Sequence, residues 1–243
     1  MAVQQATAPL PRQLPKHIAL IPDGNRRWAR QRGLPAGAGF RQGAARIPEV
    51  LGWCDQAGVQ TVTLWMLSPG NLRRGPEECA AMLTLVEESV AGLARAGRWR
   101  LAPVGDLGLL PEPTAERLRA AERATRHVRG MLVHLAVAYS GRNAVVSALR
   151  SYLSGPTARD ETGDRIAATL TAELIDAHMT AGDWSEPDLV IRTSGEQRMS
   201  GFLAWQAAES ELFFCPALWP DFTEQDLRTA LHSYGARERR YGR

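Results

Sequence analysis

Three short segments of the sequence combine acidic, amide or hydroxyl side chains with arginines, and each follows a run of apolar residues. The first segment reads Asp23-Gly24-Asn25-Arg26-Arg27-Trp28. Gly24 lets the backbone approach a ligand closely, and the free N–H groups of a helix that begins here favour an anion. Arg26 and Arg27 can add charge-assisted hydrogen bonds to phosphate oxygens, and Asp23 can hold an Mg²⁺ ion that bridges to a diphosphate. For this segment alone, a capping aspartate beside a solvated basic helix face explains the pattern equally well.

The second segment contains Ser68, Asn71 and Arg74, and it follows a run that is rich in β-branched residues. It therefore places hydroxyl, amide and guanidinium groups where a strand ends. An ordinary turn that opens with capping residues is the alternative interpretation.

The third segment runs from Asp188 to Ser200 and contains Arg192 and Arg198. Two arginines and the hydroxyl of Ser200, converging from one loop, can bind a second phosphate group. Glu211 lies at the start of the next apolar run and is a candidate to support a metal ion. A cluster of surface salt bridges is the alternative interpretation of this segment.

The elements that must position these segments alternate along the chain. Strands are expected at 17–22, 59–67, 98–103, 131–138, 188–192 and 212–215, and helices at 25–32, 44–57, 76–96, 113–127, 142–153, 167–179, 202–208 and 223–234. This alternation predicts an α/β fold with a mostly parallel six-stranded sheet flanked by helices. In such folds ligands bind beyond the carboxyl ends of the strands. We expect a flexible tail over residues 1–15, which contain three prolines, and a single catalytic domain over 16–243.

Composition limits the classes of function. The chain has 243 residues, a net charge of +3 and an isoelectric point near 9.0, which suits an anionic ligand or at most peripheral contact with an acidic membrane. Basic residues are interleaved with acidic ones, so we do not expect a nucleic-acid partner. The three cysteines form no CxxC pair, and neither a signal peptide nor a spanning apolar run is visible. We therefore expect a cytoplasmic protein.

Taken together, the three segments resemble the cis-prenyltransferases, the undecaprenyl diphosphate synthase family. The matching stretches are His17 to Ala29, Ser68 with Asn71 and Arg74, Asp188 to Ser200, Phe202 to Gln206, Glu211 to Phe214, Leu218 to Phe222 and Arg237 to Gly242. The resemblance covers the chain from about residue 15 to its end. It implies a homodimeric, Mg²⁺-dependent transferase of isoprenoid biosynthesis whose substrates are dimethylallyl diphosphate, isopentenyl diphosphate or both.

The resemblance also implies roles for individual residues. The allylic diphosphate would bind at Gly24, Arg26, Arg27, Trp28, Phe40 and Arg74, and the second diphosphate at Arg192, Arg198 and Ser200. Asp23, Asn25, Ser68 and Asn71 would be catalytic, and Asp23 and Glu211 would hold Mg²⁺. An apolar tunnel for the growing chain would lie between the sheet and the helix at about 77–96. The allylic diphosphate would leave, and a double bond of the second substrate would attack the cation-like carbon before a proton is lost.

Several positions depart from the pattern of the family. Ala36 stands where an arginine is usual, Phe40 where a histidine is usual, and Gly70 and Leu72 where Glu and Trp are usual. Ala144 replaces an acidic residue. Because these changes should weaken regular elongation, and because Phe40 can stabilise a carbocation, we expect irregular head-to-middle coupling of two dimethylallyl diphosphates, of the lavandulyl or cyclolavandulyl type.

Regular cis elongation with isopentenyl diphosphate, to undecaprenyl or shorter products, is the first alternative. A non-catalytic subunit of a heteromeric prenyltransferase is the second. Such subunits usually lose the first acidic residue, so the presence of Asp23 favours activity.

Overall fold

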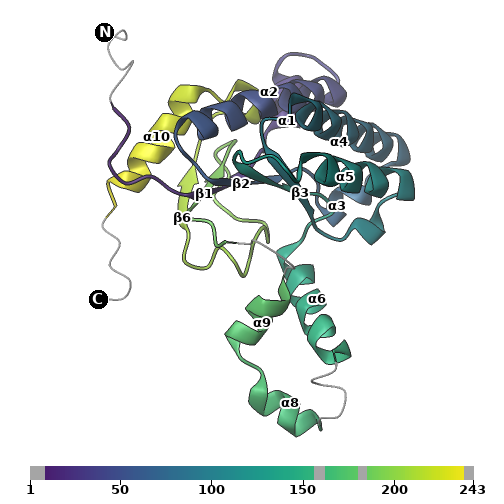
Figure 1. Cartoon of the computed structure of the whole chain (residues 1–243). Coiled ribbons are helices and arrows are strands. Elements are labelled where there is room, and N and C mark those ends of the chain that lie inside the picture. Colours follow the sequence, from purple (N-terminus) through teal and green to yellow (C-terminus); the bar gives the residue numbers. More distant parts are fainter. Residues whose placement is uncertain (1–8, 156–161, 180–184, 238–243) are drawn as a thin grey trace.

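A six-stranded parallel sheet forms the centre of the protein (Figure 1). The computed structural model describes residues 9–155, 162–179 and 185–237. The strands are β1 (His17–Ile21), β2 (Thr61–Trp65), β3 (Arg100–Val104), β4 (Leu132–Ala136), β5 (Leu189–Arg192) and β6 (Glu211–Phe214). Their order is β3-β4-β2-β1-β5-β6, and every pairing is parallel. The predicted six-stranded α/β fold is thus confirmed. A mostly parallel sheet was predicted, and all of its strand pairs are parallel.

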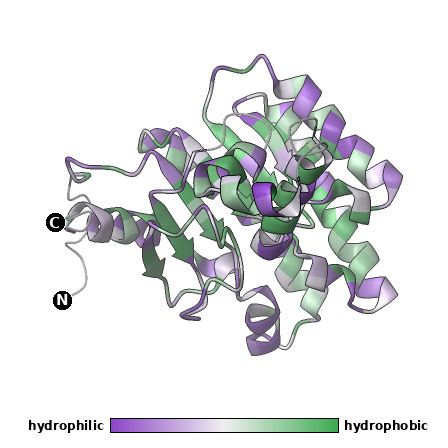
Figure 2. Ribbon diagram, turned by 90° about the horizontal axis from the view of Figure 1, so that it is seen from below, coloured by the Kyte–Doolittle hydropathy of each residue, from purple (hydrophilic) through white to green (hydrophobic). Residues whose placement is uncertain are grey.

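Side chains of β1 alternate between two cores, as the two faces of a strand require. Ile18 and Leu20 belong to the larger core, and Ala19 and Ile21 to the smaller one. The larger core is covered by α2 (Ala36–Gln56), α4 (Pro76–Ala96), α5 (Glu112–Thr125) and α10 (Glu224–Gly235). The strands are mostly hydrophobic along their length, whereas the helices carry hydrophilic stretches as well (Figure 2). A sheet buried on both faces holds the ends of its strands in fixed positions.

The opposite face is covered more lightly. Phe202 and Leu203 are fully buried there, in a segment of consecutive turns over 200–209. A helix predicted at 202–208 is therefore wrong, because Ser200 and Leu203 have positive φ angles of 51° and 45°, which no right-handed helix contains. Farther along, α6 (Gly141–Ser154), α8 (Gly163–Thr169) and α9 (Ala172–Met179) project as an arm (Figure 1).

Other boundaries differ from the sequence prediction for local reasons. The helix predicted at 44–57 begins eight residues earlier as α2, and the one predicted at 167–179 is divided into α8 and α9 around Leu170. The segment after β2, for which an ordinary turn was the alternative interpretation, forms the short helix α3 (Pro69–Leu72). Two 3-10 turns, η1 (Leu107–Leu109) and η2 (Trp219–Asp221), were not predicted.

The ends of the chain are described only in part. Within the predicted tail, residues 1–8 lie outside the described residues, while Leu10 and Leu14 pack against the larger core. The stretch at 237–242 that matches the family also lies largely outside the described residues. Among the helices that are described, none has both the length and the apolar character needed to cross a bilayer.

Candidate active site

Three neighbouring strands bring the three polar segments to one edge of the sheet. The segments follow β1, β2 and β5, which are adjacent in the order β2-β1-β5. A cavity of about 950 Å³ opens beyond the carboxyl ends of these strands. Its walls come from β1, α1 (Asn25–Gln31), α2, α3 and α4, together with Arg192 and Ser200. This is the position at which parallel α/β folds bind ligands.

Asp23 and Arg192 form the centre of the polar end. The Arg192 guanidinium donates one hydrogen bond to Asp23 Oδ2 (2.8 Å), one to Ser200 Oγ (2.8 Å) and one to the carbonyl of Arg198. Arg192 is 4% exposed, whereas 40% of the Asp23 side chain is exposed. A buried cation therefore fixes one side of the Asp23 carboxylate and leaves the other side accessible from the cavity.

Gly24 makes this arrangement possible. Its φ is +108°, and a Cβ added there would lie 2.9 Å from Leu218 Cδ2 and 3.1 Å from Ser194 Cβ. Both the backbone angle and the lack of space require glycine. The backbone N–H of Gly24 donates to Asp23 Oδ1 (2.7 Å), and the N–H of Asp23 donates to Thr193 Oγ1 (2.8 Å). The loop after β1 is thus tied to the loop after β5.

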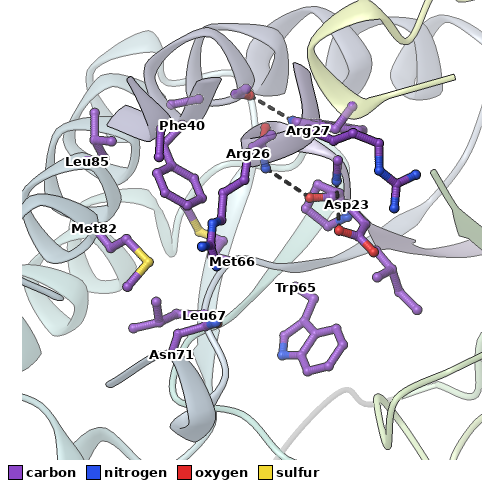
Figure 3. A pocket seen from close by; sticks show the side chains of 18 of the residues that line it. Asp23, Arg26, Arg27, Phe40, Trp65, Met66, Leu67, Asn71, Met82 and Leu85 are labelled. Atoms are coloured by element: carbon purple, nitrogen blue, oxygen red, sulfur yellow. Dashed lines mark hydrogen bonds between the residues drawn. The ribbon is translucent and has the colours of Figure 1, made fainter. Parts of the chain in front are cut away.

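The arginines of α1 differ in their partners. Arg27 donates to the carbonyl of Ser194 (2.9 Å) and pairs with Glu196 (2.7 Å), which also pairs with Arg198. Hydrogen bonds from Arg27 and Arg198 lower the pKa of the Glu196 carboxyl. Arg26, by contrast, makes no such bond within the described part of the chain, and its side chain extends into the cavity (Figure 3).

Asn25 lies at the same helix start. Its amide nitrogen donates to the carbonyl of Pro22 (3.2 Å), while its Oδ1 is buried and accepts no hydrogen bond from any described residue. Asn25 lines the cavity. A buried carbonyl oxygen without a donor is costly unless a ligand or water supplies one.

Ser68 and Asn71 hold each other in a capping box at the start of α3. The N–H of Ser68 donates to Asn71 Oδ1 (2.8 Å), and the N–H of Asn71 donates to Ser68 Oγ (3.3 Å). Arg74 follows and pairs with Glu78 at 2.8 Å. All three predicted residues of this segment line the cavity.

The other end of the cavity is apolar. Phe40 on α2 faces Met66 and Leu67 after β2, and Met82 and Leu85 on α4 continue the same wall (Figure 3). Phe40 is half-buried and packs against the larger core. The cavity thus joins a charged end to a hydrocarbon-like end, which suits an amphiphile with an anionic head.

The sequence comparison decides the family. Residues 21–242 match the sequence model described as "Putative undecaprenyl diphosphate synthase". The chain belongs to the cis-prenyltransferase family. It is a transferase of prenyl groups, as the resemblance implied, and a similar fold is found in a solved member of the family.

Relatives of this cis-prenyltransferase have specific names. It is 44% identical over 245 residues to "(2Z,6E)-farnesyl diphosphate synthase" of Mycobacterium tuberculosis, covering 100% of this chain and 94% of that one. It is 46% identical to "Isoprenyl transferase 1" of Streptomyces avermitilis, over 95% of this chain and 90% of that one. A crystal structure of lavandulyl diphosphate synthase from Lavandula x intermedia, in complex with dimethylallyl diphosphate, has a TM-score of 0.87 and 32% identity, covering 95% of this chain and 99% of that chain.

Most of the predicted site residues of this cis-prenyltransferase line the one cavity. They are Asp23, Gly24, Asn25, Arg26, Arg27, Phe40, Ser68, Asn71, Arg74, Arg192 and Ser200. Trp28 does not line it: its indole N–H donates to Asp221 (2.7 Å). Arg198 is exposed and pairs with Glu196, and only its carbonyl takes part, by accepting from Arg192.

Glu211 is not brought to Asp23 within this chain. It begins β6, in register with Leu189 on β5 and, through it, with Ile18 on β1. Ile21, the last residue of β1, is therefore separated from Glu211 by two strand spacings across the sheet (about 10 Å) and by three residues along the strand direction (about 10 Å). Glu211 pairs with Arg237 instead. No group of three or more potential metal ligands occurs among the described residues.

Arg30 lines the cavity but was not predicted as a site residue. It follows Arg26 by four positions, which places both side chains on one face of a helix. That spacing on the predicted helix was the signal that could have identified it.

Proposed function

We propose that this cis-prenyltransferase catalyses regular elongation of a short allylic diphosphate with isopentenyl diphosphate, giving a short cis product. Relatives that match its whole length at 44% identity are named (2Z,6E)-farnesyl diphosphate synthases, whereas the lavandulyl enzyme is 32% identical. These comparisons favour the alternative of regular elongation over the irregular coupling that we expected from the departures.

The observation that carries this proposal is that one cavity has two chemically distinct ends. Asp23, Arg192 and Ser200 lie at the polar end, and the walls from α2 and α4 are apolar. A volume of about 950 Å³ is that of a small-molecule site. Two diphosphates can bind at the polar end while the prenyl chain enters the apolar end, and holding both reactants together lowers the barrier to condensation.

Individual residues have defined tasks in this proposal. Arg192 and the Ser200 hydroxyl bind the diphosphate of isopentenyl diphosphate, and Arg26 and the helix start at Asn25 bind the allylic diphosphate. Phe40 has no polar atom, so it contacts the prenyl chain rather than a phosphate. Cationic and N–H groups that already surround the leaving diphosphate stabilise the charge that develops as its bond to carbon breaks.

The chain fits a magnesium ion at Asp23. Mg²⁺ is commonly held by one or two carboxylates together with substrate phosphates and water, and Asp23 supplies one carboxylate with an exposed side. The bound ion would neutralise the diphosphate that leaves.

Product analysis tests the proposal directly. Purified protein with Mg²⁺ is incubated with dimethylallyl, geranyl or farnesyl diphosphate, each with and without isopentenyl diphosphate, and dephosphorylated products are identified by mass spectrometry. We expect C10 or C15 cis products only when isopentenyl diphosphate is present. A C10 product from dimethylallyl diphosphate alone would establish irregular coupling, the second candidate, which the similarity to lavandulyl diphosphate synthase supports. No product with any primer would favour a non-catalytic subunit.

The predicted metal role of Glu211 requires a second copy of the chain, because Glu211 is remote from Asp23 in one copy. We propose that the homodimer implied by the resemblance supplies it. Asp23→Ala and Glu211→Gln variants, each inactive alone, should regain part of the activity when they are mixed and refolded together, since one mixed site retains both carboxylates. Absence of recovery, or full activity of Glu211→Gln, would exclude this role.

A further inference from the structure

Arg26 and Arg30 form a pair of cationic side chains at the cavity that have no partner in the described part of the chain. They lie one turn apart on α1, both side chains are exposed, and both line the cavity. Neither makes a side-chain hydrogen bond or ion pair with any residue in 9–155, 162–179 or 185–237. Two like charges at this spacing destabilise a helix slightly, so the pair gains from an anion between the two side chains.

Two neighbouring arginines, Arg27 in α1 and Arg32 just after its end, provide a contrast. Arg27 is paired with Glu196, and Arg32 is paired with Asp221 and stacks on the Trp28 ring at 4.3 Å. Each of these two cations already has a carboxylate partner. Arg26 and Arg30 have no carboxylate partner among the described residues, and both line the cavity.

The charges of the residues that line the cavity also favour an anionic ligand. Five arginines line it, with Asp23 as the single carboxylate among its described lining residues. The five are Arg26, Arg27, Arg30, Arg74 and Arg192. Because Asp23 is already paired with Arg192, none of the described lining residues offers another carboxylate to neutralise Arg26 or Arg30. An anionic ligand would relieve this excess of positive charge.

Position 36 bears on the placement of this charge. The family resemblance implies an arginine there, whereas the first residue of α2 is Ala36, which lines the same cavity as Arg30. The turn at Gly33 and Leu34 joins the end of α1 to the start of α2, so both helix ends border the mouth of the cavity. A guanidinium on the last turn of α1 can therefore reach the region that a side chain at position 36 would occupy.

We propose that Arg30, together with Arg26, binds the diphosphate of the allylic substrate in place of the arginine that is absent at position 36. This inference rests on the proposed function for the identity of the ligand. It adds Arg30 to the residues that bind the substrate. It also means that the positive charge missing at position 36 is supplied from α1, so that the affinity for the allylic diphosphate is kept.

The test measures binding separately from turnover. Calorimetry with the unreactive thiolo analogue of geranyl diphosphate, in the presence of Mg²⁺, should give a dissociation constant about tenfold higher for Arg30→Gln than for the wild type, since a charge-assisted hydrogen bond is lost. Steady-state KM should rise for geranyl diphosphate and stay unchanged for isopentenyl diphosphate. The double variant Arg30→Gln/Ala36→Arg should recover most of the affinity.

Arg32→Gln is the matched control, because it removes the same charge one residue after the end of α1 and outside the cavity. It should leave the dissociation constant unchanged. The proposal is overturned if Arg30→Gln binds the analogue as the wild type does, if both variants weaken binding equally, or if only the KM for isopentenyl diphosphate rises. Failure of the double variant to recover would overturn the substitution for position 36. If the wild type condenses nothing yet binds the analogue through Arg30, the proposed function fails and this anion site stands.

Discussion

Removing Arg192 should cost both stability and activity, because it is the buried partner of Asp23. In Arg192→Ala the carboxylate of Asp23, the hydroxyl of Ser200 and the carbonyl of Arg198 each lose a donor. Breaking a buried pair typically costs about 3–5 kcal/mol. Since 40% of the Asp23 side chain is exposed and can be resolvated, we expect the lower end, about 3 kcal/mol. For a chain of this length, that corresponds to a Tm decrease of about 6–12 °C.

The assay is urea unfolding followed by circular dichroism, with condensation measured in parallel. Arg192→Lys keeps the charge but cannot reproduce the three-way fork of the guanidinium, so it should regain part of the stability while kcat/KM stays at least about tenfold below the wild type. Arg32→Ala, whose ion pair with Asp221 is exposed, should change stability by less than about 1 kcal/mol. If Arg192→Ala were as stable as Arg32→Ala, the buried pair would not hold the site together and the reasoning would be wrong.

Three further outcomes are expected. Burial lowers the pKa of His17 to about 4. Because the unfolded imidazole binds its proton near pH 6.5, the free energy of unfolding should be constant above that pH and fall by about 3 kcal/mol between pH 6.5 and 4. Unfolding measurements across this pH range should show no such decrease in His17→Gln. Leu85→Ala should lengthen the products, because a smaller side chain in the apolar wall enlarges the cavity. Leu83→Ala, on the same helix but outside the cavity, should leave the product length unchanged. If mass spectrometry shows that Leu85→Ala also leaves the product length unchanged, this role of Leu85 is contradicted. EDTA should abolish condensation and added Mg²⁺ should restore it; activity that persists in EDTA would contradict a metal at Asp23.

Local signals made part of the fold predictable. The helix α4 has the predicted limits, because Pro76 and two glutamates favour its first turn and Gly97, with φ +60°, ends it in the left-handed region. The apolar runs before Asp23, Ser68 and Arg192 are the strands β1, β2 and β5. Parallel strands have their carboxyl ends at the same edge of the sheet. Because β1, β2 and β5 are neighbours, the three segments that follow them lie close together.

Other features depend on long-range packing and could not be predicted locally. The first residues of α2 include Gly37, Gly39 and Gly43, a composition that disfavours a helix. The structure gives the reason for two of them: a Cβ on Gly39 would lie 2.0 Å from the Asn25 carbonyl oxygen, and one on Gly43 would lie 2.1 Å from Asn25 Oδ1. Likewise, the sequence around Glu211 does not reveal its distance from Asp23, because that distance depends on the order of the strands in the sheet.

The close crossing of α1 and α2 changes how the departures from the family pattern are interpreted. Because Gly39 and Gly43 let α2 lie directly against Asn25, Phe40 on α2 and Arg30 on α1 border one cavity. Phe40 then belongs to its apolar wall, and in our proposal the arginines of α1 supply the positive charge that Ala36 does not. On that proposal, the substitutions at positions 36 and 40 leave the cavity with a cationic mouth and a hydrocarbon wall. Departures of this kind do not by themselves favour irregular coupling, which is why the relatives that match the full length weigh more in our proposal of regular elongation.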